Sequence, residues 1–374
     1  MNQRIKVRKN NLMSKILFLP NWKVYTYKEA PNDKQPPDYF AKGKDYWFFR
    51  YFDKKPDVDI LDIRSFKWLE SFEKNKIRFY IFQALRAIPK LNKYDIVISH
   101  GMQSGIVIAL WRRFFKTRAK HIVFDIGSFN SAAESGFALK LMQYASHSID
   151  GIIYHTASQR EYYKKFFPWI VDRSQFIKFG TDYEFFTSNL KDCMETSKDT
   201  EKNEYCICVG YSKRDWDTVV KAFQMADTGN LTLKLVGHID EKYNNIANIE
   251  QIGFVSINEL MNLIMNAKFS VLPLKSYNYS YGQMTLMQQM AMRKCVITSK
   301  VPSLVDYVED KKTALLYEPE NAELLADILE LINSDDNLRT EIEENAARYI
   351  REINNETTMA KDIESFIRKY EVGN

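Results

Sequence analysis

The sequence predicts an α/β protein with two doubly wound domains that face each other across a cleft. Short apolar segments alternate with helix-length segments in both halves of the chain, and one polar segment separates the halves. Continuous apolar strands between helices are typical of parallel sheets covered on both faces. Ligands bind such folds at the carboxyl ends of the strands, so we expect a site in the cleft.

The first half alternates regularly between predicted strands and helices. Its apolar segments indicate strands at 15–20, 57–63, 94–100, 121–126 and 151–156, with helices at 79–91, 105–115, 136–149 and 158–167. We place the N-terminal domain at residues 14–186. Residues 187–204 are polar and charged without periodicity, which predicts a linker.

The pattern then restarts in a C-terminal domain at residues 205–350. Its elements are predicted strands at 205–210, 231–237, 249–255, 269–274, 295–299 and 314–319, separated by helices that include 217–226, 257–267 and 281–291. The remaining residues, 351–374, predict a helix, which we expect to pack back on the N-terminal domain.

Bulk properties exclude several classes of protein. A content of 45% hydrophobic residues in 374 excludes a largely disordered chain, and a net charge of +5 is too weak to indicate nucleic-acid binding. No apolar run approaches the roughly 20 residues of a membrane helix. The apolar part of the basic start is too short for a signal peptide and is interpreted as a strand. We therefore expect a cytoplasmic protein.

The four cysteines, Cys193, Cys206, Cys208 and Cys295, have no spacing typical of metal ligands. Cys206 and Cys208 alternate with apolar residues along a predicted strand. We interpret the cysteines as buried thiols in a reducing compartment, and we expect no bound metal.

The helix predicted at 281–291, YGQMTLMQQMA, raises the question of an anion site. Gly282 would let a ligand approach the backbone, and the free amides of Gln283, Met284 and Thr285 would attract negative charge. The Thr285 hydroxyl would add a donor. The alternative is that these polar residues only cap a buried helix.

Three segments carry a resemblance to a known family, in this order: IKFGTDYEFF at 177–186, CVGYSKRDWDTVVKAF at 208–223, and residues 271–321. They resemble the end of the first domain, the phosphate loop and the donor region of family 4 GT-B glycosyltransferases. The resemblance implies the GT-B fold, with two Rossmann-like domains that hold a nucleotide-sugar between them. It also implies transfer of the sugar with retention. We expect a UDP-sugar as donor, and no metal ion, because Arg214, Lys213 and the helix amides would meet the charge.

The sequence departs from that family at its two donor-site glutamates, which are separated by seven residues. By alignment the first falls on Ser280 and the second on Gln288. Gln288 still offers an amide oxygen to a ribose diol, although less strongly than a carboxylate. This departure leaves open a catalytically impaired homologue that binds a nucleotide-sugar.

The phosphate loop also differs. Tyr211 stands where the family has arginine, and Arg214 where it has lysine, with Lys213 beside it. A guanidinium binds phosphate oxygens bidentately, so Arg214 is expected to stabilise the leaving diphosphate. The alternative is a solvated basic turn. Asp215 is expected to cap the next helix.

Further candidate residues lie at strand ends. Asp125 is expected to hold sugar hydroxyls or to act as a general base, which would imply inversion. His100 is a candidate catalytic residue or a hydrogen-bonded structural histidine. Asn21 and Trp22 are expected on the acceptor side, and Phe254 lies where the family holds the base.

The predicted function is transfer of a hexose from a nucleotide-sugar to a polysaccharide or lipid-linked saccharide. A nucleotide-sugar epimerase of the same fold is a further alternative. Aromatic and basic residues combine in two segments, 111–120 and DYWFFRYFDKK at 45–55. This combination predicts peripheral contact with an anionic membrane, at its inner face; the alternative is that the aromatic residues pack against the sheet.

Overall fold

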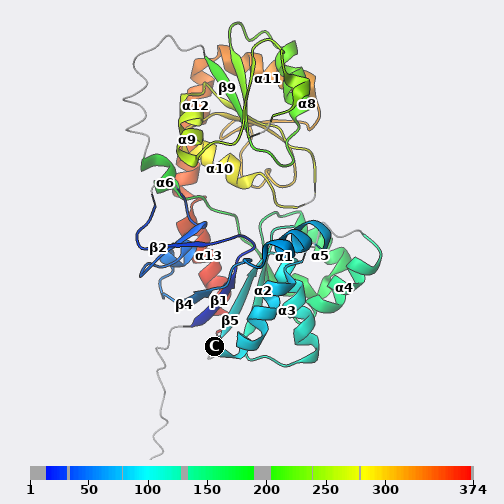
Figure 1. The fold of residues 1–374 in the computed structure, drawn as a ribbon. Helices are drawn as coiled ribbons and strands as arrows, with labels where there is room; N and C mark the ends of the chain where they lie inside the picture. The colour runs from blue at the N-terminus through cyan, green and yellow to red at the C-terminus, as the bar shows by residue number, and fades with distance from the viewer. Residues whose placement is uncertain are drawn as a thin grey trace, which may run out of the picture.

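The computed structural model describes residues 14–31, 34–77, 79–127, 134–188, 204–237, 239–277 and 279–371 (Figure 1). Most of the predicted linker, residues 189–203 with Cys193, lies outside the described residues. Two parallel sheets of six strands each, one in each half of the chain, organise the described part.

The N-terminal sheet has the strand order β4-β1-β5-β6-β7-β8, and every neighbouring pair is parallel. Its strands are β1 (Lys15–Leu19), β4 (Asp57–Ile60), β5 (Ile96–His100), β6 (Lys120–Asp125), β7 (Gly151–Tyr154) and β8 (Ser174–Phe176). Its helices are α1 (Lys67–Phe72), α2 (Ile81–Ala87), α3 (Met102–Phe114), α4 (Phe137–Ser146) and α5 (Gln159–Phe166).

Short elements complete this half. They are the strand pair β2 (Tyr25–Tyr27) and β3 (Tyr39–Ala41), the 3-10 helices η1 (Trp47–Tyr51), η3 (Ile88–Lys93) and η4 (Pro168–Arg173), the π-helix η2 (Glu73–Ile77), and α6 (Tyr183–Ser188).

The C-terminal sheet has the order β11-β10-β9-β12-β13-β14, also parallel throughout. Its strands are β9 (Tyr205–Val209), β10 (Thr232–Val236), β11 (Ile249–Ile252), β12 (Ser270–Leu272), β13 (Val296–Ser299) and β14 (Leu315–Tyr317). Its helices are α8 (Trp216–Met225), η5 (Glu241–Tyr243), α9 (Ile257–Asn266), α10 (Gln283–Ala291), α11 (Ala322–Ser334) and α12 (Asp336–Glu352).

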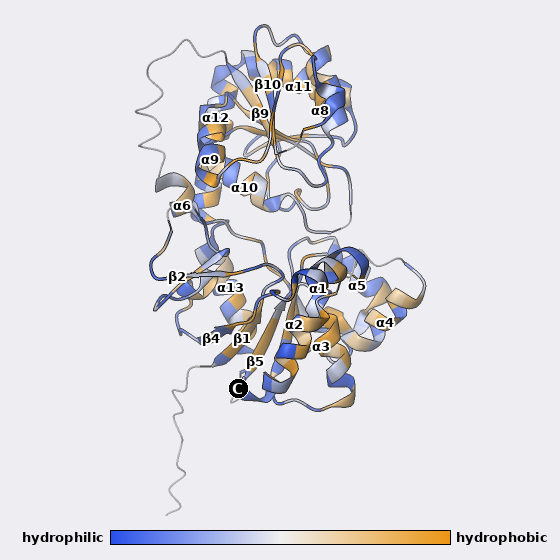
Figure 2. Cartoon of the chain, in the orientation of Figure 1, coloured by the Kyte–Doolittle hydropathy of each residue, from blue (hydrophilic) through white to orange (hydrophobic). Residues whose placement is uncertain are grey.

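The central strands of both sheets are buried on their two faces, as their apolar runs require, whereas the edge strands β4, β8 and β11 are partly exposed. In β9, for example, Ile207 packs into one core cluster and Cys208 into the cluster on the opposite face. Colouring by hydropathy shows apolar strands inside and polar helix surfaces outside (Figure 2). Cys206, Cys208 and Cys295 are buried and unpaired, which confirms the interpretation of these three as buried thiols.

The last helix, α13 (Glu356–Arg368), lies against the N-terminal domain, beside β1 and β2 in Figure 1. Met359, Ile363 and Phe366 belong to the same core cluster as strands β1, β5 and β6. Asn355, the residue before α13, forms a bridge with Thr181. The chain therefore crosses between the domains at two adjacent points.

Segment 45–55, expected at a membrane surface, instead lies largely in the core. Tyr46, Trp47, Phe48, Phe49 and Phe52 are all buried, and η1 packs them against β1 and α13. The membrane prediction was wrong for this segment. The prediction failed because α13, which is far away in the sequence, packs over these aromatic rings and buries them.

The carboxyl ends of the N-terminal strands face the C-terminal domain. After β7, the His155 carbonyl accepts a 2.7 Å hydrogen bond from the Tyr307 hydroxyl, and the Ala157 amide donates to Asp306 at 2.8 Å. Among the described residues, no helix is long and apolar enough to cross a bilayer.

Candidate functional site

The start of α10 lies on the side of the C-terminal domain that is turned to the N-terminal domain (Figure 1). Gly282 precedes the helix in the left-handed conformation, with φ of 80°. A Cβ at this position would lie 2.6 Å from Leu274 Cδ1, so only glycine is accommodated. No side chain caps α10, and its first amides therefore remain open to a ligand.

Arg214 lies directly against this helix start. Its Nη2 donates to Thr285 Oγ1 at 3.0 Å, Nε to the Val209 carbonyl at 2.8 Å, and Nη1 to the Ser212 carbonyl at 3.0 Å. A guanidinium carries five N–H donors, so two remain for an anion. Burial lowers the pKa of Arg214, yet arginine stays charged at neutral pH.

The loop that carries Arg214 is fixed by its backbone. Gly210 has φ of 127°, and a Cβ there would lie 2.4 Å from Arg214 Nη2. Arg214 forms a bridge with Leu274, and the Asp215 amide donates to the Pro273 carbonyl at 3.0 Å. Asp215 caps α8 by accepting from the Thr218 amide, which confirms its predicted role.

Lys213 approaches two of the three tyrosines in the loop before α10. Its Nζ lies 4.4 Å from the centroid of the Tyr277 ring and 6.0 Å from that of Tyr279, and the rings of Tyr277, Tyr279 and Tyr281 contact one another. A hydrogen bond with Tyr279 raises the pKa of Lys213. Its positive charge therefore lies beside the same helix start.

Exposed apolar side chains stand at the carboxyl ends of three adjacent strands. Tyr211 follows β9, Ile239 follows β10 and Phe254 follows β11; they are 69%, 62% and 78% exposed. The rings of Tyr211 and Phe254 meet edge to face at 5.4 Å. The pair forms an aromatic surface next to the Arg214 loop.

Gln288 lies one turn after Thr285, so both side chains lie on the same side of α10. Gln288 is half-buried, and no described residue makes a hydrogen bond with its side chain. The neighbouring Gln289 is fully buried and donates to the Thr285 carbonyl at 2.9 Å. Gln288 is therefore the glutamine that remains available to a ligand. Met284 packs on the core.

Ser280 and Gln283 join α10 to the N-terminal domain. The Ser280 hydroxyl lies 2.9 Å from Thr156 Oγ1 and donates to Gln159 Oε1 at 3.3 Å. Gln283 Nε2 donates to Thr156 Oγ1 at 3.3 Å. Ser280 thus belongs to the contact between the domains, and the Gln283 side chain points to that contact.

Asp125 is fully buried and its carboxylate holds neighbouring chain segments. Oδ1 accepts from the Gly127 amide at 2.9 Å, while Oδ2 accepts from Gln159 Nε2 at 3.0 Å and from the Tyr163 hydroxyl at 2.5 Å. A Cβ on Gly127 would lie 2.3 Å from Tyr279 Cβ. This geometry favours a positioning role for Asp125 over that of a base.

His100, Trp22 and Asn21 form a separate group in the N-terminal domain. The rings of His100 and Trp22 meet edge to face at 4.7 Å, and Asn21 lies against Gly101. His100 is buried among aromatic rings, and neither ring nitrogen has a hydrogen-bond partner among the described residues. Burial lowers the pKa of His100, so its imidazole is neutral.

The structure therefore brings Lys213, Arg214, Gly282 and Thr285 together, with Gln288 on the next turn. No hydrogen bond or ring contact between described residues joins the His100 group to them. Sequence reasoning missed Thr156 and Gln159, although a polar stretch directly after an apolar strand was visible in TASQ. It also missed the alternating tyrosines before Gly282.

Solved structures with the same arrangement of two α/β domains are glycosyltransferases. An Anabaena protein, HepE, covers 95% of this chain and 100% of its own at a TM-score of 0.65 and 13% identity. It is described in complex with UDP and with UDP-glucose. Sucrose-phosphate synthase from Thermosynechococcus elongatus covers 95% and 98% at a TM-score of 0.68 and 15% identity. The chain therefore has the GT-B fold, as the resemblance implied.

A family model matches part of the chain. Residues 195–349 match the model of the family described as glycosyl transferases group 1. An uncharacterized glycosyltransferase of Methanocaldococcus jannaschii is 31% identical over 128 residues. That match spans 34% of this chain and 35% of the relative. Membership of family 4, and the alignment of Ser280 and Gln288 with its glutamates, stay predictions.

Proposed function

We propose that this protein transfers a hexose from a UDP-sugar to a saccharide acceptor. The observation that carries the proposal is the contact of Arg214 with Thr285 at the uncapped start of α10. Helix amides and a guanidinium with two free donors together suit a diphosphate. The Tyr211–Phe254 pair offers an aromatic surface to the uracil, and Gln288 an acceptor to the ribose.

The charge that develops on the leaving diphosphate is met by Arg214, Lys213 and the amides of α10. Fixed cations and dipoles at a developing anion are commonly the largest electrostatic contribution to catalysis. This arrangement supplies that stabilisation from the protein itself, so we propose a reaction without a metal ion.

We propose that the hexose is transferred with retention of its anomeric configuration. Inversion needs a general base next to the acceptor hydroxyl. The two candidates for this base are Asp125 and His100, and the surroundings of each are unfavourable for that role. The Asp125 carboxylate already accepts three hydrogen bonds, and His100 is enclosed by aromatic rings. The anomeric coupling constant of the product, measured by NMR, distinguishes the two outcomes: an inverted product contradicts retention.

Donor hydrolysis tests the proposal without knowledge of the acceptor. The protein is incubated with a panel of UDP- and GDP-hexoses, and free nucleotide diphosphate is measured. We expect slow release of UDP from one UDP-hexose, lost in Arg214→Ala. Binding without release would indicate the impaired homologue, and a changed sugar still attached to UDP would indicate the epimerase.

A lipid-linked acceptor would be met at a membrane surface, and part of segment 111–120 suits such contact. Phe114 and Phe115 are 71% and 52% exposed, with Arg113 and Lys116 exposed beside them. Arg112 is not available, because it pairs with Asp150 at 2.7 Å. We propose that these four exposed residues contact anionic lipid.

Sedimentation with anionic liposomes at low and high salt tests the membrane contact. We expect binding at low salt that is lost when Arg113 and Lys116 are both replaced by glutamine. The matched control replaces the exposed Lys311 and Arg348 of the C-terminal domain. Equal loss in both double variants would indicate a general charge effect and would overturn the proposed surface.

A further inference from the structure

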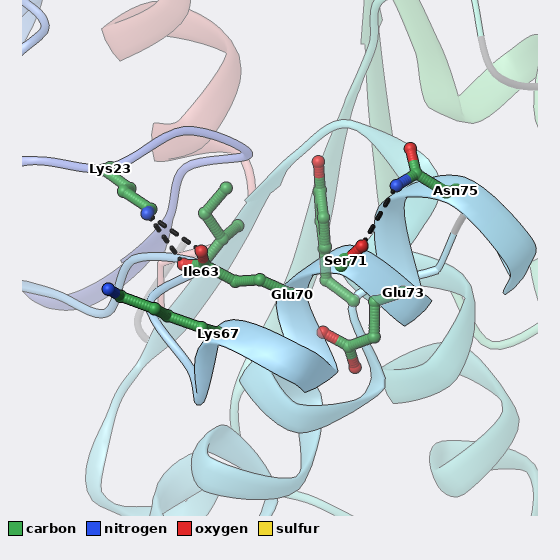
Figure 3. Close-up of a pocket in the computed structure, with 8 residues that line it drawn as sticks. Lys23, Ile63, Lys67, Glu70, Ser71, Glu73 and Asn75 are labelled. Carbon is green, nitrogen blue, oxygen red and sulfur yellow. Dashed lines mark hydrogen bonds and ion pairs between the residues drawn. The ribbon is translucent and has the colours of Figure 1, made fainter.

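A pocket of about 430 Å³ lies in the N-terminal domain, and its lining includes no residue of α10 or of the Arg214 loop (Figure 3). Lys23, in the loop after β1, and Ile63, in the loop after β4, line one part of it. β1 and β4 are parallel neighbours, so the pocket lies at the carboxyl edge of the sheet. This edge also carries the contacts with the C-terminal domain, three strands away at β7, or roughly 15 Å along the edge.

Helix α1 turns its polar side to this pocket. Lys67, Glu70 and Ser71 line the pocket, and their spacing of three and four residues places them on one face of the helix. Trp68 and Phe72, on a different face, are 71% and 49% exposed. An ordinary surface helix buries its apolar face. In α1 this arrangement is reversed: two large apolar side chains are exposed, and the hydrogen-bonding groups line the cavity.

The π-helix η2 follows α1 directly and brings Glu73 and Asn75 to the same pocket. Such π-turns are rare and occur frequently at functional sites. Glu73 is only 2% exposed, and its Oε1 accepts from the Phe82 amide at 2.8 Å. No described residue makes a hydrogen bond with its Oε2. This oxygen is an acceptor that a ligand in the pocket could satisfy.

The charges of the pocket balance. Two lysines, Lys23 and Lys67, face two carboxylates, Glu70 and Glu73, and Lys23 is paired with Glu70 at 2.9 Å (Figure 3). A phosphate would have to approach both carboxylates. A neutral ligand with many hydroxyl groups would instead donate to the carboxylates and accept from the amines, and it would meet Ser71, Asn75 and Tyr80 as well.

We propose that this pocket binds a sugar unit of a neutral saccharide acceptor. The inference rests on the proposed glycosyl transfer, because that reaction requires a saccharide acceptor. The volume lies within the range of small-molecule sites. The pocket also adjoins Asn21 and Trp22 through Lys23, at the side of the domain where the sequence predicts the acceptor.

Saturation-transfer NMR with a fixed panel tests the pocket. The panel contains cellotriose, maltotriose, chitotriose and glucose 6-phosphate. We expect at least one neutral trisaccharide to bind the unmodified protein, and its Kd to rise tenfold or more in Glu73→Gln and in the double variant Ser71→Ala/Asn75→Ala. The matched control, Ser334→Ala/Asn266→Ala, removes two exposed polar groups elsewhere and should leave the Kd unchanged.

Three results would overturn the inference: no neutral trisaccharide binds, the Kd is the same in the pocket variants, or glucose 6-phosphate binds best. If Glu73→Gln fails to fold, the exposed double variant decides alone. UDP titration of the same proteins separates the two proposals. Normal UDP binding with unaltered saccharide binding rejects only the pocket, whereas absent UDP binding with saccharide binding that is sensitive to the variants rejects only the transferase.

Discussion

At the scale of residues, Arg214 joins the loop after β9 to α10, and its replacement gives the sharpest expectation. In Arg214→Ala we expect kcat to fall about 10²-fold or more, the usual cost of removing one donor to a developing charge. Arg214→Lys should recover part of the loss, because it keeps the charge without the forked donors. Steady-state kinetics measures both. Near-normal turnover in Arg214→Ala would remove it from the mechanism.

Gln288 gives a second expectation at this scale. Gln288→Ala should weaken UDP binding about fivefold, since it removes one hydrogen-bond acceptor worth roughly 1 kcal/mol. Gln288→Glu should keep or strengthen binding, because a carboxylate accepts ribose hydroxyls more strongly than an amide. Gln289→Ala is unsuitable as a control, since Gln289 is buried. Unchanged affinity in Gln288→Ala would show that the ribose lies elsewhere.

Residues close in sequence to a recognisable element could be predicted, and those held by distant partners could not. Arg214, Gly282 and Thr285 follow from a phosphate loop and a helix start. The partners of Asp125, by contrast, are Gln159 and Tyr163, which lie more than 30 residues away. Their hydrogen bonds depend on how α5 packs on the sheet, which a single sequence does not show.

At the scale of elements, the start of α10 depends on Gly282. Gly282→Ala should cost at least 1–2 kcal/mol, because alanine is strained at φ of 80° and its Cβ would meet Leu274. We expect a lower melting temperature together with weaker UDP binding. The double variant Gly282→Ala/Leu274→Ala would relieve the contact but not the backbone strain, and it should not restore binding. Full UDP affinity in Gly282→Ala would contradict this view of the helix start.

Helix α13 is attached through a buried acid whose effect depends on pH. Arg50 contacts both Glu356 and Asp182, at 2.8 and 2.7 Å. Burial nevertheless raises the pKa of Glu356 to about 7, so its stabilising contribution is largest at low pH and is lost as the pH rises through 7. Burial lowers the pKa of His155 to about 4, so its contribution is lost as the pH falls from 6.5 to 4.

These two effects oppose each other in the unmodified protein. Glu356→Gln removes one of them, so between pH 7 and pH 4.5 its free energy of unfolding should fall by about 3 kcal/mol more than that of the unmodified protein. Urea unfolding at several pH values measures the slope. Identical slopes for both proteins would show that Glu356 is not the titrating group.

Most strands of the two sheets and most long helices could be predicted from their apolar periodicity, whereas several short elements, among them β8, η1 and η2, could not. In the sequence alone, the aromatic segment of η1 resembles an interfacial surface; in the structure, α13 covers this segment. The π-helix η2 has no sequence signature, because its polar residues suit a loop equally well.

At the scale of the whole molecule, Thr156 connects the domains through Ser280 and Gln283. Thr156→Val keeps the shape of the side chain but leaves buried polar groups unpaired, at about 1–3 kcal/mol. We expect faster hydrogen exchange at the start of α10. Thr298→Val, which removes a similar buried hydroxyl within the C-terminal domain, is the matched control. Equal exchange at α10 in both variants would exclude a role for the interdomain contact.

The proposed nucleotide site involves residues, elements and both domains. Calorimetric titration with UDP tests this site without knowledge of the sugar or the acceptor. The arrangement of Arg214, Thr285 and α10 predicts that one UDP binds per chain, with an affinity at least tenfold weaker in Arg214→Ala and unchanged in Arg348→Ala. No heat of binding in the unmodified protein, or equal affinities in all three proteins, would contradict a nucleotide-sugar site at the start of α10.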